Sequence, residues 1–108
     1  MNREELDCQL SLMKNTIMAL QEHLAPEFRS RDFVLLKYSF TQKQVSELDD
    51  YFMQITMEKS KVSKEDFRKK LAEIRGLPHL TKEVAEDVLL SYKADDLHTK
   101  VVNNILKK

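Results

Sequence analysis

The side chains that most often bind metals or catalyse reactions are few in this chain and lie far apart. His23, His79 and His98 have no second histidine or cysteine three or four residues further on, whereas zinc sites need clustered ligands. The one cysteine, Cys8, has no general base near it in the sequence, and a lone helical cysteine is usually a small apolar residue. The only glycine, Gly76, falls at a predicted helix end, which excludes a glycine-rich phosphate loop or a nucleophile elbow. We therefore predict no catalytic, metal or cofactor site, and no enzyme.

A second chemical feature is a basic cluster around one predicted helix–helix link. It comprises Lys59, Lys61, Lys64, Arg68, Lys69 and Lys70. Glu58, Glu65 and Asp66 lie among them, so the cluster has two interpretations. It is either a solvated, salt-bridged face or a docking site for an acidic partner or a nucleic-acid backbone, with Lys61, Lys64, Arg68 and Lys69 as contacts. The whole chain balances 18 basic against 18 acidic side chains, so we expect no large phosphate-tracking surface.

The stretch FTQKQVSEL, residues 40–48, is typical of the first helix of a helix-turn-helix DNA reader. That motif needs a short turn and then a recognition helix. Here the helical period continues through residues 49–55 without a breaker. Thr41 as N-cap and Gln44 in the capping-box position explain the stretch without DNA. We therefore predict a strong helix start here rather than a DNA-reading motif.

Hydrophobic periodicity predicts helices along the whole chain. The expected ranges are 2–24, 30–38 with a start at Ser30 or Asp32, 42–59, 64–75, 82–93 and 95–106 with a start near Asp95 or Asp96. One glycine and two prolines provide too few turn residues for an all-β fold. A chain of 108 residues is one domain by length. We predict an all-α, compact bundle of five or six helices with long first and third helices, in a single domain covering residues 1–108.

The first helix has an a/d stripe of apolar residues, called the heptad stripe below. It consists of Leu6, Leu10, Met13, Ile17, Leu20 and Leu24. Our first interpretation is that this is a core helix of the bundle; the alternative is that part of its surface pairs with a second copy or a partner. Cys8, Leu12 and Met18 widen the apolar surface beyond the stripe, so these three are the candidate partner-binding residues. Pairing requires them to be partly exposed within one chain.

From Phe33 to Leu106 the order of features resembles the YhaI-like family of bacterial proteins. The matching parts are residues 32–36 before a Thr-capped helix, residues 62–67, and residues 88–92 followed by a last helix. The resemblance implies a helical architecture, and it implies no activity because the family has none established. In size and helical pattern the chain is also similar to the helical immunity proteins that protect bacteria from their own bacteriocins.

These observations favour a small non-enzymatic protein that acts by protein–protein interaction, in a regulatory or adaptor role, with a protein partner or as a homodimer. The alternatives are a nucleic-acid-associated regulator that uses residues 59–70 and an immunity-type bundle. We expect no cofactor and no small-molecule substrate. No apolar run approaches the roughly 20 residues that span a bilayer. The lone cysteine and the lack of a signal segment predict a cytoplasmic location.

Overall fold

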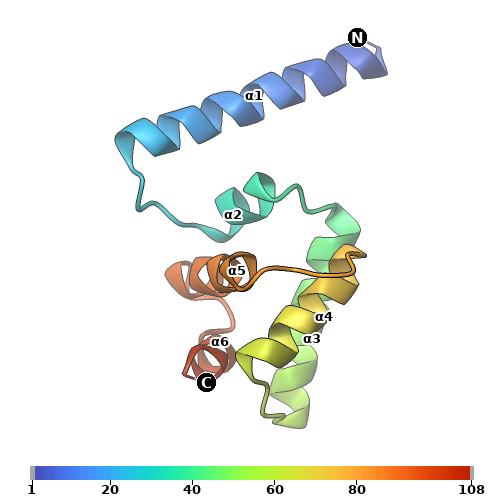
Figure 1. The fold of residues 1–108 in the computed structure, drawn as a ribbon, viewed down its shortest axis with the longest axis vertical. Coiled ribbons are helices and arrows are strands. Elements are labelled where there is room, and N and C mark those ends of the chain that lie inside the picture. Colours follow the sequence, from blue (N-terminus) through green and yellow to red (C-terminus); the bar gives the residue numbers. More distant parts are fainter. Residues whose placement is uncertain (1, 108) are drawn as a thin grey trace.

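The computed structural model describes residues 2–107 and folds them into six α-helices, with no strand in that range. The helices are α1 (Arg3–Leu24), α2 (Arg31–Lys37), α3 (Gln42–Glu58), α4 (Lys64–Arg75), α5 (Lys82–Ala94) and α6 (Thr99–Leu106). Helices α2 to α6 pack together, and we call them the body. Helix α1 extends along one side of the body (Figure 1). The all-α fold with a long first helix is confirmed.

Local chemistry at the helix ends follows the sequence closely. Thr41 Oγ1 accepts a hydrogen bond from the Gln44 N–H at 3.1 Å, and Gln44 Oε1 accepts one from the Thr41 N–H at 3.0 Å. Ser63 and Asp66 make the same reciprocal box at the start of α4. Gly76 ends α4 in the left-handed region, with φ of 69°, where a side chain is strained. Helix α3 continues for 17 residues without a turn, so residues 40–48 begin a long helix.

The core of the body is built around stacked aromatic rings. Phe52 of α3, Phe67 of α4 and Tyr92 of α5 are all fully buried. The Phe52 ring centroid lies 5.6 Å from that of Phe67 and 4.9 Å from that of Tyr92. The His98 ring stacks on Phe52 at 5.1 Å, so this histidine serves packing. Rings from α3, α4 and α5 and from the residue just before α6 meet at this centre, which gives the body a core of its own.

Helix α2 is short and buries only part of its apolar surface. Val34 and Leu35 are buried, but Leu36 is 39% exposed, so one side of the helix faces solvent. Ser30 Oγ caps it by accepting a hydrogen bond from the Phe33 N–H at 3.1 Å.

The last helix starts later than predicted. A start at Asp95 or Asp96 is wrong, because α6 begins at Thr99. Asp96 has a φ of 55°, and the Leu97 N–H donates to the Tyr92 carbonyl at 2.9 Å. This left-handed closure terminates α5 where we expected a new helix to begin. It leaves α6 with eight residues.

The expectation that the first helix is a core helix is wrong. No residue of α1 is buried. The six residues of the heptad stripe are all exposed, from 42% for Ile17 to 78% for Leu24. The physical reason is that α3 to α6 close around their own aromatic core, and α1 meets the rest of the chain mainly at α2.

Candidate interaction surface

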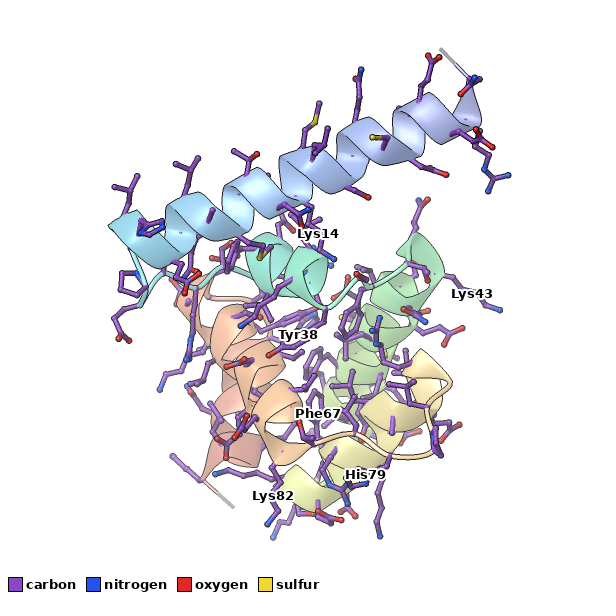
Figure 2. The ribbon with its side chains drawn as sticks, turned by 45° about the horizontal axis from the view of Figure 1, so that its top comes forward. Lys14, Tyr38, Lys43, Phe67, His79 and Lys82 are labelled. Atoms are coloured by element: carbon purple, nitrogen blue, oxygen red, sulfur yellow. The ribbon has the colours of Figure 1, made fainter. Side chains whose placement is uncertain are left out.

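Helix α1 touches the body along one narrow edge. Its only half-buried side chains are Lys14, Met18 and Gln21, which at this spacing lie on one side of a helix. The Lys14 ammonium donates a hydrogen bond to Ser39 Oγ in the link after α2. Figure 2 shows Lys14 on the side of α1 that faces α2. The contact is thin and partly polar, so it holds the helix against the body without burying it.

The heptad stripe points neither towards the body nor directly away from it. With about 100° between successive residues, its centre lies roughly 80° around the helix from the edge formed by Lys14, Met18 and Gln21. Ile17, which borders that edge, is the least exposed member, and Leu24 at the end of the helix is the most exposed. The stripe is therefore an open apolar line beside the contact with the body.

The three candidate residues on α1 are at least partly exposed, as pairing requires, but they do not form one surface. Cys8 is exposed, and Leu12 is 61% exposed. Met18 is half-buried, on the edge that meets the body. The helical period places Cys8 and Leu12 away from the heptad stripe. The stripe is thus the larger continuous apolar surface, and sequence reasoning misplaced it in the core. The sequence did contain a signal for this surface. An apolar period of strictly 3.5 residues with few charged residues beside it is typical of helices that pair with another helix.

Helix α1 is supported by local interactions. Asn2 Oδ1 accepts a hydrogen bond from the Glu5 N–H at 2.8 Å. Acidic Glu4 and Glu5 lie in the first turn and His23 in the last, where each suits the helix dipole. Most helical stability in proteins comes from packing an apolar face, and α1 has no buried residue. Covering the stripe would therefore stabilise α1.

Two side chains of the basic cluster, Lys64 and Arg68, make contacts on the α5 side of α4. Lys64 Nζ lies 3.7 Å from Glu86 Oε1. Arg68 pairs with Glu65 and also donates to the Leu80 carbonyl at 2.8 Å. The hydrogen bonds from the Arg68 guanidinium lower the pKa of the Glu65 carboxyl. These two basic side chains are occupied by partners within the chain.

The other basic side chains of the cluster do not lie on the α5 side of α4. Lys70 Nζ lies 3.5 Å from Glu73 and 5.8 Å from the Tyr51 ring centroid, on the α3 side of α4. Lys61 and Lys69 are exposed. The basic side chains therefore diverge around α4 instead of forming one phosphate-facing surface. This geometry favours the salt-bridged interpretation of the cluster.

An open groove of about 720 Å³ lies between α3 and α6. Its floor includes Ile55, Val101 and Ile105, and Lys59 and Lys61 lie on its rim. The groove combines apolar and basic side chains but brings no buried polar groups together that would orient a small ligand.

Within residues 2–107, no three histidine, cysteine or acidic side chains lie close enough together to hold a metal ion. In the same range, no helix has both the length and the apolar character that crossing a membrane requires. Comparison of the chain with protein-family models, curated proteins and solved structures finds no match.

Proposed function

We propose that this protein acts by protein–protein interaction, in a regulatory or adaptor role, and that α1 is its docking helix. One observation carries the proposal: six large apolar side chains in a heptad register are exposed along a single helix. Isolated exposed apolar residues are ordinary on protein surfaces, but a continuous apolar line of this size marks an interaction site. A non-enzymatic role rests on the sequence, with its scattered histidines and lone glycine.

The charge of α1 favours a protein partner over a membrane surface or a nucleic acid. Amphipathic helices that bind anionic lipid carry lysines and arginines on their polar face. Helix α1 instead carries four carboxylates against two basic side chains: Glu4, Glu5, Asp7 and Glu22 against Arg3 and Lys14. Lipid phosphates and nucleic-acid phosphates would both be repelled by this excess.

The body supports this role as a scaffold. Its core is complete without any α1 side chain. A partner can therefore cover the heptad stripe without opening the body. This arrangement separates the part that maintains the fold from the part that we propose makes contact.

Site-specific photo-crosslinking tests the proposal. A photoreactive amino acid replaces Ile17 in the heptad stripe, and a control replaces Glu83, which is exposed on α5. After irradiation of cells that naturally contain the protein, we expect a covalent adduct to a protein from position 17 and none from position 83. Absence of any adduct from position 17, at normal levels of the protein, would contradict a docking role for α1.

A further inference from the structure

We propose that the occupant of the heptad stripe is α1 of a second copy, and that the two helices pair in parallel. This inference rests on the proposed function of α1 as a docking helix, and it adds the identity and orientation of the partner. Four observations support it: the register of the stripe, its area, the position of the body, and the residues beside the stripe.

The register of the stripe suits pairing with itself. Leu10, Ile17 and Leu24 occupy a positions. The d positions are Leu6, Met13 and Leu20. In a parallel, in-register pair, each a residue meets its own equivalent and each d residue does the same, so no apolar side chain lacks a partner. Ile17, a β-branched residue at the central a position, and the leucines at two of the three d positions agree with two strands rather than three or four.

The exposed area of the stripe reaches the size that a dimer needs. The six side chains are each about half exposed or more. At about 100 Å² apiece they present roughly 600 Å² of apolar surface per copy. Two copies would bury roughly 1,200 Å², the lower limit for a specific protein–protein interface before any flanking side chains are counted. We therefore expect a dimer that dissociates on dilution rather than an obligate one.

The position of the body determines the orientation of the pair. The body contacts α1 on the side of its e positions, which include Lys14 and Gln21. In an antiparallel pair the e sides of both helices lie on the same face, so the two bodies would meet there. In a parallel pair the e side of each helix borders the g side of the other, and the bodies lie on opposite faces. Only the parallel pair leaves separate room for both.

The residues beside the stripe agree with this orientation. In a parallel pair the e position of Lys14 borders the g position of Gln9, and that of Gln21 borders Thr16. None of these pairs brings like charges together. An antiparallel pair that covers the whole stripe places Lys14 of one copy beside Lys14 of the other, which is repulsive.

Analytical ultracentrifugation over a wide concentration range tests self-association. We compare the full chain with two variants, Ile17→Lys in the stripe and Leu12→Lys off the stripe. Both replace an exposed apolar residue of α1 with the same cation. We expect a monomer–dimer equilibrium that Ile17→Lys weakens about tenfold or more and Leu12→Lys changes by less than about twofold. A wild-type chain that stays monomeric throughout, or equal effects of the two variants, would overturn the proposal.

The native cysteine offers a direct test of orientation. Cys8 is the only cysteine, is exposed, and lies opposite the stripe at an f position, so a spin label there should not disturb the pairing. From the helix rise and the spacing of packed helices, the two Cys8 Cβ atoms would be roughly 15 Å apart in the parallel pair and roughly 25 Å apart in the antiparallel pair. A label-to-label distance by pulsed electron resonance that matches the longer separation would overturn the parallel arrangement.

The two proposals fail in different ways. A monomeric chain whose position 17 crosslinks to a different protein would overturn self-pairing and leave α1 as a docking helix. A monomeric chain with no crosslink from position 17 would overturn both proposals.

Discussion

Helices α1 and α3 are both capped and amphipathic, but only the apolar stripe of α3 is buried. Each begins with a side-chain N-cap and carries an apolar stripe at helical spacing. In α3 that stripe is buried, with Leu48 and Phe52 fully enclosed by the body. In α1 no residue is buried. An amphipathic pattern thus predicts that a face will be covered, but it does not reveal whether the cover comes from the same chain.

The two regions also differ in how polar groups connect them to the rest of the molecule. In the body, Asp49 accepts hydrogen bonds from Arg31 at 2.6 Å and from the Tyr92 hydroxyl at 2.7 Å, which joins α2, α3 and α5. Within residues 2–107, α1 has one polar contact of comparable sequence range, from Lys14 to Ser39. The body should therefore unfold as a unit, and α1 should fray independently.

The largest effect on the free energy of unfolding should come from a substitution in the aromatic centre of the body. Phe52→Ala removes a fully buried ring that contacts Phe67 and Tyr92. We expect a loss of about 3–5 kcal/mol in the free energy of unfolding, measured by urea denaturation. Phe28→Ala is the matched control: Phe28 is 50% exposed in the link after α1, and we expect a loss below about 1 kcal/mol. Equal losses in the two variants would show that the body is not the stable unit we describe.

The next largest effect should come from the polar network. Asp49→Ala removes the carboxylate that accepts hydrogen bonds from Arg31 and from the Tyr92 hydroxyl, and we expect a loss of about 1–3 kcal/mol in the free energy of unfolding. Asp32 also pairs with Arg31, at 3.4 Å, but its side chain is 92% exposed. Asp32→Ala should therefore change the free energy of unfolding by less than about 0.5 kcal/mol. Denaturant titration of both variants tests this contrast, and an Asp32 effect as large as that of Asp49 would refute it.

A smaller loss of folding stability should appear at alkaline pH. Burial, followed by the hydrogen bond to Asp87, raises the pKa of Tyr38 to about 12. Burial also raises the pKa of Tyr92 above its ordinary value. Because the folded-state pKa exceeds the unfolded value of about 10, the stabilisation is complete below pH 10 and is lost as the pH rises towards 12.

The urea midpoint measured at several pH values from 8 to about 11.5 should fall above pH 10. Tyr38→Phe should make that fall shallower, because it removes one of the shifted groups. An unchanged slope in the variant would show that Tyr38 does not contribute to the pH dependence.

The smallest effect on folding should come from the heptad stripe. In dilute solution, Ile17→Lys should change the free energy of unfolding of the body by less than about 0.5 kcal/mol, because no α1 residue is buried. The same change at Ile55, buried in α3, should prevent stable folding. Thermal melts followed by circular dichroism compare the two, and strong destabilisation by Ile17→Lys would place α1 in the core after all.

The features that the sequence predicted well depend on neighbours along the chain. The capping box at Thr41 and the helix end at Gly76 are set within a few residues, so composition and spacing sufficed. The start of α6 was mispredicted because Asp96 adopts a left-handed conformation that closes α5. The same residue types would also suit a helix N-terminus, so local rules could not decide between them.

The candidate site was only partly predictable for a related reason. The sequence showed that α1 has an apolar face and that Leu12 and Cys8 extend beyond it. Whether that face meets the body depends on how α2 to α6 fill their own core, which no local pattern reports. In the basic segment 59–70, Lys64 and Lys70 both belong to α4, and the six-residue step from one to the other turns them about 120° apart around the helix, so Lys64 lies towards α5 and Lys70 towards α3.

Hydrogen exchange of the full chain at low and high protein concentration tests the central claim most directly. We predict that amides of α1 exchange rapidly in dilute solution and become protected as the concentration rises, while amides of α3 and α5 keep the same slow rates throughout. Protection of α1 that equals that of α3 at every concentration would contradict the account, because it would mean that the body alone covers the heptad stripe.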